Sequence, residues 1–317
     1  GEDDYAVAAE NGIFDPTSHG TLYNPVGLDG RFDRRVSGFE DRFVKDPEVT
    51  RALIDDLDRR GLLFHEQVYE HAYPHCWRCG TPLLYYAKPS WYIRTSQLRD
   101  RLLAANETID WHPEHIKHGR FGKWLENNVD WALSRERYWG TPLPIWRCEA
   151  GHDTAIGSLT ELSERAGRDV TDVDPHRPFI DEITFACPTC DTPSTRVPEV
   201  IDTWYDSGAM PFAQWGYHPE LDRGVAEFEA AFPADFISEA IDQTRGWFYT
   251  LMAEAVLQFD QTAYRNVVCL GHLIAADGRK MSKSLGNQFD PWEALDRQGA
   301  DALRWWMLTN GSPWESR

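Results

Sequence analysis

Two apolar stretches near the carboxyl end of the chain predict strands of one β-sheet. The run 266–274 is apolar and has the length of a strand, and 232–237 predicts a shorter strand before it. Between them, 239–259 carries apolar residues at helical spacing and predicts a long helix. Strand, helix and strand in this order form a βαβ unit, in which the two strands lie parallel. The pattern therefore predicts an α/β fold.

Further helices are predicted on both sides of this unit. Asp46 and Asp290 are suitable N-cap residues, and each is followed by a proline, Pro47 or Pro291, at the first helical position. The other predicted helices cover 96–105, a segment through 121–128, and 300–308. The stretch 71–94 is rich in aromatic residues and predicts β-structure. No apolar run reaches the ~18 residues that a membrane span needs, so we expect no membrane partner.

The segment 277–287, between the predicted strand and the helix after Asp290, places two lysines in a loop with glycines and serines. Ammonium groups are strong point charges and backbone N–H groups add hydrogen-bond donors, which suits a polyphosphate. The segment is not a P-loop, because the string G-x-x-x-x-G-K-[ST] does not occur in the sequence. The alternative is an exposed basic turn. Lys280 and Lys283 are therefore candidate phosphate-binding residues.

The start of the predicted helix 239–259 carries side chains that suit a small-molecule site. Glu239, Gln243 and Trp247 are four residues apart, which places them on one helix face at the carboxyl end of a strand. A carboxylate can bind ribose hydroxyls, an amide can bind an amino group, and an indole can wall an apolar pocket. The alternative is a polar helix face that meets water. Gly246 argues against it, because a glycine inside a helix costs roughly 1 kcal/mol and often indicates close packing or a bound group.

The cysteines indicate a metal site. Two C-x2-C pairs occur among the six Cys, and such pairs are typical of metal knuckles. Four soft ligands in two close pairs match a structural Cys3His zinc site: Cys148, His152, Cys187 and Cys190. The alternative is buried free thiols beside a surface histidine. Cys76 and Cys79 form a knuckle with no partner pair in the sequence, which predicts half a site. The segment 148–190 is polar, and we expect it to have little apolar core of its own.

Composition indicates a folded protein with an acidic surface. Hydrophobic residues make up 42% of the 317 residues and 14 are Trp, which is typical of a globular protein rather than a disordered one. The 51 acidic against 32 basic side chains give a formal net charge of −19. This balance argues against a surface that coats nucleic acid nonspecifically, although a local basic groove for RNA is compatible with it.

The string 280–284, Lys-Met-Ser-Lys-Ser, resembles letter for letter the KMSKS loop of class I aminoacyl-tRNA synthetases. Four segments are similar, in the same order, to successive blocks of the isoleucyl-tRNA synthetases: 134–146, 202–208, 237–248 and 278–287. The string 242–248, Asp-Gln-Thr-Arg-Gly-Trp-Phe, favours this family over its valyl and leucyl relatives, which are the alternative. A further alternative is a zinc-stabilised RNA-binding module without catalysis. The lysine loop favours the enzyme, because such a module needs no nucleotide pocket. Taken alone, 202–208 predicts a turn.

The resemblance implies an α/β fold, namely the second half of a Rossmann-like class I synthetase catalytic domain with a small zinc-binding insertion and the tail of an editing domain. It implies that 1–65 is the C-terminal tail of the editing insertion. The segment 66–147 is then a return connection with a cysteine knuckle that re-enters the catalytic domain. The zinc-binding insertion is 148–199, and 200–317 is the second catalytic half with the KMSKS loop and the following helices. The family's His-x-Gly-His string is absent from this sequence, so we expect an internal part of a longer protein that is inactive alone.

The resemblance also implies roles for individual residues. Lys280 and Lys283 are implied to be catalytic, because they stabilise charge on the ATP phosphates. The residues implied to hold ATP or the adenylate are Glu239, Ser282, Lys283, Gly271 and His272. The implied substrate is ATP with Mg²⁺, and the implied cofactor is Zn²⁺ on the Cys3His set.

The other implied roles concern the amino acid and the tRNA. Gln243 lies near the amino group of isoleucine, and Trp247 and Trp204 wall its side chain. Asp4, just before a tyrosine, holds the amino group of a mischarged amino acid in the editing domain. The implied partners are L-isoleucine and tRNA(Ile), and we expect a cytoplasmic monomer.

Overall fold

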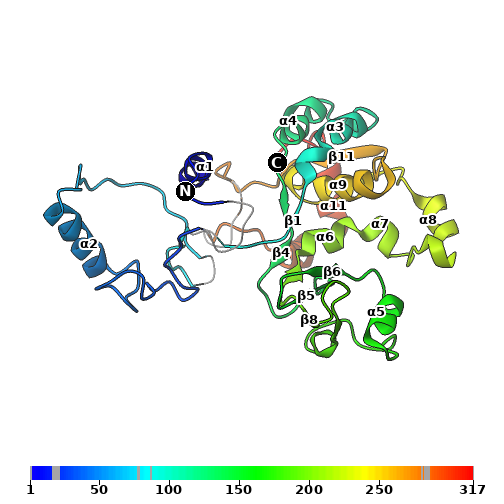
Figure 1. Ribbon diagram of the computed structural model, residues 1–317. Coiled ribbons are helices and arrows are strands. Elements are labelled where there is room, and N and C mark those ends of the chain that lie inside the picture. Colours follow the sequence, from blue (N-terminus) through cyan, green and yellow to red (C-terminus); the bar gives the residue numbers. More distant parts are fainter. Residues whose placement is uncertain are drawn as a thin grey trace. The chain divides into compact units, whose positions relative to one another are not determined.

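The computed structural model describes residues 2–15, 22–76, 79–85, 88–279, 281 and 286–316. The chain divides into two compact units, Gly1–Pro89 and Ser90–Arg317 (Figure 1). Three residues predicted for the ATP site, Lys280, Ser282 and Lys283, lie outside the described residues. Across the described ranges, no helix is long and apolar enough to span a bilayer.

The first unit contains two helices, α1 (Glu2–Glu10) and α2 (Pro47–Arg59). The second begins as predicted, because the side chain of Asp46 accepts a hydrogen bond from the backbone N of Glu48 at 2.9 Å. The predicted β-structure over 71–94 is wrong for most of its length. In its described part only a bridge between His75 and Pro82 and the short strand β1 (Tyr92–Ile93) form. Aromatic side chains such as Tyr85 stay exposed there, so no strand gains a buried face.

A parallel sheet of three strands forms the centre of the second unit, in the order β10 (Ile237–Ala240), β11 (Asn266–Leu270) and β2 (Asp110–His112). The register pairs Ile237 with Val267 and Val267 with Trp111. The parallel pairing of β10 with β11 confirms the predicted βαβ unit. The strand predicted at 232–237 is placed too early, since the strand begins at Ile237 and Pro233 has no N–H to donate to a ladder.

The helix between these strands begins later than predicted. Residues 239 and 240 belong to β10, a short 3-10 segment η5 (Ile241–Arg245) follows, and α9 covers Trp247–Phe259. Gly246 stands at the junction with φ −146° and ψ −116°, outside the helical region. The apolar pattern continued through this break, and for that reason the sequence alone did not reveal it.

The main hydrophobic core surrounds α9, in which every residue from 248 to 256 is buried. Two helices predicted from the sequence pack against this core, namely α3 (Arg99–Glu107) and α4 (Gly122–Glu126) (Figure 1). The indole of Trp111, on β2, is 1% exposed and lies at the centre of the same core. Strand β2 was not predicted, because three residues are too few to show a period.

A second sheet, drawn in green in Figure 1, covers most of the segment predicted to be an insertion, and we keep the name insertion for this part of the chain. It is antiparallel, and its order is β6 (Asp153–Ala155), β5 (Ile145–Cys148), β8 (Pro193–Arg196) and β7 (Phe185–Ala186). The helix α5 (Leu159–Ala166) beside it is capped by the hydroxyl of Ser158, which accepts from the N of Glu161 at 3.1 Å. The expectation of little apolar core is wrong. Apolar side chains scattered along the segment converge into a small buried cluster: Trp146, Ile156, Leu162, Val170, Ile180, Ile183 and Phe185.

The segment 202–208 is a helix and not the predicted turn. It forms α6 (Thr203–Gly208), and the side chain of Asp202 caps it by accepting from the N of Trp204 at 3.3 Å. The C-terminal helices match the prediction, since α10 (Pro291–Gln298) has Asp290 as N-cap and α11 is Ala300–Thr309. The remaining elements are η1 (Thr95–Leu98), η2 (Lys117–Phe121), β3 (Trp131–Ala132), β4 (Ser134–Arg135), η3 (Phe179–Glu182), β9 (Val200–Ile201), α7 (Met210–Ala213), η4 (Pro219–Leu221) and α8 (Val225–Ala231).

Candidate functional site

A four-residue cluster of metal-binding side chains lies at one end of the insertion. The ligand atoms of Cys148, His152, Cys187 and Cys190 all lie within 4.8 Å of one another. The Sγ atoms of Cys148 and Cys190 are 3.7 Å apart, and Nδ1 of His152 is 3.5 Å from Sγ of Cys148 and 3.8 Å from Sγ of Cys187. A tetrahedral zinc with bonds of about 2.3 Å to sulfur and about 2.0 Å to nitrogen holds its ligand atoms roughly 3.5 to 3.8 Å apart. The four side chains therefore fit a tetrahedral metal ion.

Two tight turns position these ligands. In the first, the N of Cys148 donates to the carbonyl of His152 at 3.2 Å, and in the second the N of Cys187 donates to the carbonyl of Thr192 at 2.8 Å. Backbone N–H groups also point at the sulfurs, with the N of His152 at 3.4 Å from Sγ of Cys148. Burial alone would raise the pKa of the Cys148 thiol, but hydrogen bonds from the His152 backbone and neighbouring side chains lower it to about 6. The thiolate, which is the form that binds a metal, is therefore favoured at neutral pH.

The second cysteine pair lies in the first unit. Cys79 is exposed, and its Sγ lies 3.0 Å from Oγ1 of Thr81. The hydrogen bonds from Thr81 lower the pKa of this thiol to about 7. Among the described residues, no third ligand joins Cys76 and Cys79. The pair stays a predicted half-site.

An aromatic wall forms where α6 meets the start of α9, and we use this name for Trp204, Gln243 and Trp247. The Oε1 of Gln243 accepts a hydrogen bond from the N of Trp247 at 2.9 Å. The indole Nε1 of Trp247 donates to the carbonyl of Ser207, on α6, at 3.0 Å. A Cβ added at Gly246 would lie 2.7 Å from Oε1 of Gln243 and 3.0 Å from Cη2 of Trp204. The three predicted amino-acid-binding residues thus meet at a glycine that has no room for a side chain.

An ion pair between a buried carboxylate and a partly exposed arginine anchors this wall, and the sequence did not indicate it. The carboxylate of Asp202, with a side chain 7% exposed, lies 2.6 Å from Nη2 of Arg135 on β4. The indole Nε1 of Trp131 also donates to it, at 3.5 Å. Because Asp202 caps α6, the pair holds the start of the helix that carries Trp204. The only sequence signal was that both residues fall in blocks that resemble one family.

The predicted helix face with Glu239 is wrong. Glu239 is exposed on β10, paired with Cys269 of β11, and does not share a helix with Gln243 and Trp247. It still lies near the carboxyl end of its strand, where open α/β sheets bind ligands. Gly271 and His272 follow the end of β11 directly, and the N of Gly271 donates to the carbonyl of Pro313 at 3.0 Å.

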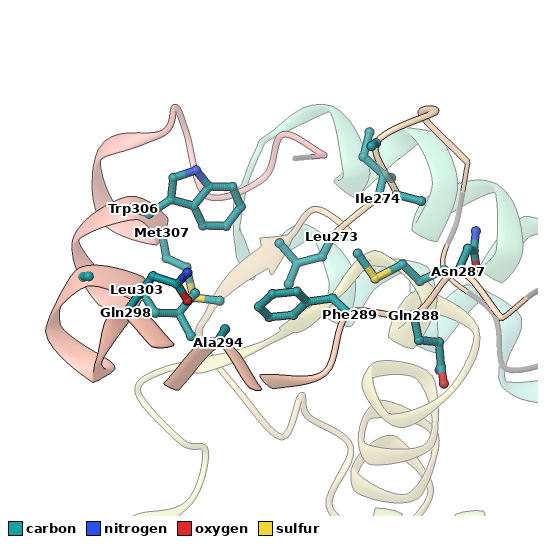
Figure 2. Close-up of a pocket in the computed structure, with 14 residues that line it drawn as sticks. Leu273, Ile274, Asn287, Gln288, Phe289, Ala294, Gln298, Leu303, Trp306 and Met307 are labelled. Atoms are coloured by element: carbon teal, nitrogen blue, oxygen red, sulfur yellow. The ribbon is translucent and has the colours of Figure 1, made fainter. Parts of the chain in front are cut away.

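An apolar cavity of about 630 Å³ lies beyond the end of β11, and the sequence did not predict it. Figure 2 shows Leu273 and Phe289 on one side, facing Trp306 and Met307 of α11. Met281, from the predicted lysine loop, also lines the cavity, whereas the aromatic wall contributes nothing to it. Asp4 lies on α1, in the first unit.

Comparison with known protein families identifies the class of protein to which this chain belongs. The model of class I tRNA synthetases (I, L, M and V) matches residues 20–315. The chain belongs to this family, which confirms the predicted fold of a class I synthetase catalytic domain.

The individual relatives found by sequence similarity include isoleucine–tRNA ligases. Isoleucine–tRNA ligase of Streptomyces avermitilis is 59% identical over 319 residues, which cover 100% of this chain and 29% of that protein. Isoleucine–tRNA ligase of Cutibacterium acnes is 58% identical over 93% of this chain and 26% of that protein. A solved structure of Mycobacterium tuberculosis methionyl-tRNA synthetase bound by methionyl-adenylate is 19% identical, with a TM-score of 0.44 over 76% of this chain and 37% of that chain. The chain thus spans less than a third of the length of these curated ligases.

Proposed function

We propose that the chain is part of an isoleucine–tRNA ligase, which activates L-isoleucine with ATP and transfers it to tRNA(Ile). The observation that carries this proposal is the aromatic wall of Trp204, Gln243 and Trp247 at Gly246. Two indoles can enclose a branched aliphatic side chain, and the Gln243 amide beside them can take its ammonium group. The similarity to isoleucine–tRNA ligases supports the same substrate.

The reaction proposed for this site needs no protein nucleophile. A carboxylate oxygen of isoleucine attacks the α-phosphorus of ATP, a new P–O bond forms, and pyrophosphate leaves with its bridging oxygen. Lys283, supported by Lys280, neutralises the charge that grows on the leaving pyrophosphate, with Mg²⁺ bound to the nucleotide. The residues proposed to hold the nucleotide are Glu239 at the ribose, Ser282, Gly271 and His272.

The metal proposed for the four-residue cluster is a structural zinc ion. Three thiolates and one imidazole are soft and borderline ligands that complete a tetrahedron, which leaves no open position for catalysis. Cys148, His152, Cys187 and Cys190 would hold this ion, which would cross-link the two turns that carry them.

The remaining roles belong to the whole protein. We propose tRNA(Ile) as partner, a cytoplasmic monomer as the working form, and an editing function in which Asp4 holds the amino group of mischarged valine. The domain roles predicted from the sequence for 1–65, 66–147, 148–199 and 200–317 are part of this proposal.

Aminoacylation by the full-length protein tests the proposed function. Labelled isoleucine should be attached to tRNA(Ile) transcripts in an ATP-dependent reaction, and not to tRNA(Val) or tRNA(Leu). Preferred charging of a valine or leucine tRNA would assign the chain to a relative within the same family. If the protein binds RNA but charges no tRNA, the proposed function is wrong and the chain belongs to an RNA-binding module without catalysis.

A further inference from the structure

A glutamate lies in the middle of the most buried helix of the protein. Glu254 is 1% exposed and stands in the buried stretch of α9. Neither of its carboxyl oxygens has a hydrogen-bond partner among the residues that the structure describes. Burying an acid without partners is unfavourable, so this position needs a compensating reason.

The carboxyl group of Glu254 lies against the last residue of α6. A Cβ added at Gly208 would overlap Oε1 of Glu254, and it would lie 2.8 Å from Cδ of that side chain and 3.0 Å from the carbonyl carbon of Thr250. With the carboxyl group of Glu254 and the backbone of Thr250 this close, residue 208 has no room for a side chain. The pair determines how closely α6 can approach α9.

The same helix carries one side of the aromatic wall. Trp204 stands four residues before Gly208, so both project from one face of α6. The carbonyl of Ser207 accepts from Nε1 of Trp247, which joins the two helices next to the pair. A shift of α6 away from α9 would consequently lift Trp204 from Gly246 and widen the wall.

Glu254 is expected to be neutral, which allows α6 to pack closely against it. Burial raises the pKa of Glu254 to about 9, and the negative charge of Asp206 acts in the same direction. Tyr205 of α6 also faces this group, and burial together with Glu254 raises the pKa of its phenol. The acid is therefore neutral at pH 7, and α6 packs on a carboxylic acid rather than on a charge.

We propose that Gly208 and Glu254 act as a packing lock, a pair of positioning residues that sets the distance of Trp204 from Gln243 and Trp247 and thereby the size of amino acid that the wall accepts. The proposal rests on the proposed function, because it names the residues that determine specificity at the amino-acid site. Neither residue belongs to the wall, so each would act through the position of Trp204.

A rescue experiment tests the lock in the full-length protein. The isoleucine KM and kcat are measured by ATP–pyrophosphate exchange for wild type, Gly208→Ala, Glu254→Ala and the double variant. Gly208→Ala should raise KM roughly 10-fold and change kcat less than about 3-fold, because ground-state fit is lost while the phosphate chemistry is untouched. Removing the carboxyl group relieves the two closest overlaps and leaves only the 3.0 Å approach to the carbonyl carbon of Thr250, so the double variant should reverse most of the rise in KM.

Two controls separate the lock from a general loss of stability. Gly157→Ala, where a Cβ has its nearest neighbour at 3.6 Å, should leave KM unchanged. Glu254→Gln keeps the shape and should keep the neutral-pH KM. As the pH rises past 9 the wild-type KM should increase more than that of Glu254→Gln, because only the wild type gains a negative charge at this position. An unchanged KM in Gly208→Ala, or a double variant no better than Gly208→Ala, would overturn the lock.

The outcome distinguishes this proposal from the proposed function. A wild-type protein without isoleucine-dependent exchange would refute the function alone. The wild type and the same three variants would then be compared by denaturant unfolding of the full-length protein. Coupling of at least ~10-fold in the unfolding equilibrium constant would support contact between the two residues, and additive effects would overturn it.

Discussion

The metal cluster and the aromatic wall are built in opposite ways. Each metal-ligand pair comes from one turn, with at most three residues between the two ligands, and the two turns meet through neighbouring strands β5 and β8. The wall combines Trp204 of α6 with Gln243 and Trp247 around the start of α9, and it depends on how those helices pack. Ligand geometry at the cluster is thus encoded locally, whereas the shape of the wall is a property of the tertiary structure.

This difference has a consequence for substitutions. A change at the cluster would remove one of four proposed metal ligands, all of which lie in two neighbouring turns, so we expect its effect to stay in this part of the chain. A change near the wall acts through packing, so residues outside the wall, such as Asp202 and Glu254, can alter its shape. The predictions below test this contrast.

The largest effect is expected at the metal cluster. Cys187→Ser should weaken zinc binding by roughly 10²-fold or more, since four ligands share the ~10–16 kcal/mol that structural zinc sites contribute. Elemental analysis of the purified protein would show zinc lost after dialysis against a mild chelator. Glu149→Gln is the matched control, because its side chain is exposed in the same turn as Cys148 and is not a ligand of the cluster, and it should keep the metal. Equal zinc content in both variants would contradict the assignment.

The next largest effect is expected in the lysine loop. In the full-length protein Lys283→Ala should lower kcat of ATP–pyrophosphate exchange at least ~10²-fold with little change in isoleucine affinity, because the charge it neutralises grows only in the transition state. Arg279→Ala is the control, since this guanidinium is paired with Asp277 at 2.6 Å and should contribute little. If Lys283→Ala weakens isoleucine binding and leaves kcat unchanged, Lys283 does not act on the transition state as proposed.

The buried acid predicts a pH dependence of stability. The folded pKa of Glu254, about 9, lies above its ordinary value of 4.5, so the folded state keeps a proton that the unfolded state releases. Its contribution to stability is fully present below pH 4.5 and is lost as the pH rises toward 9. Relative to Glu254→Gln, the wild-type free energy of unfolding should fall by about 3 kcal/mol from pH 6 to pH 8. Denaturant titrations at each pH measure this free energy, and Glu229→Gln, at an exposed glutamate, is the control. If the wild type and Glu254→Gln show the same dependence on pH, the acid is not buried.

A smaller effect is expected from the wall itself. Trp204→Ala should raise the isoleucine KM roughly 10-fold, as expected for one apolar side of a pocket, and should leave the zinc content unchanged. Trp305→Ala, an exposed tryptophan on α11, is the control and should alter neither. Loss of zinc in Trp204→Ala would show that the two sites are not independent.

The sequence predicted the features that depend on neighbouring residues. The caps Asp46 and Asp290 were identified because a proline follows each one, and the cluster ligands because of their spacing. The start of α9 was misplaced because the break at Gly246 depends on Trp204, a residue distant in the sequence. The small core of the insertion was missed for the same reason, since its apolar residues are scattered until the chain folds.

One measurement tests the central claim most directly, namely that the wall accepts a branched aliphatic amino acid. Full-length protein is assayed for ATP–pyrophosphate exchange with isoleucine, valine, leucine and methionine in parallel. The proposed function predicts the highest kcat/KM for isoleucine, with valine lower by roughly 10- to 200-fold because it lacks one methylene group. A higher kcat/KM for leucine, methionine or valine would contradict the assignment of Trp204, Gln243 and Trp247 as an isoleucine site.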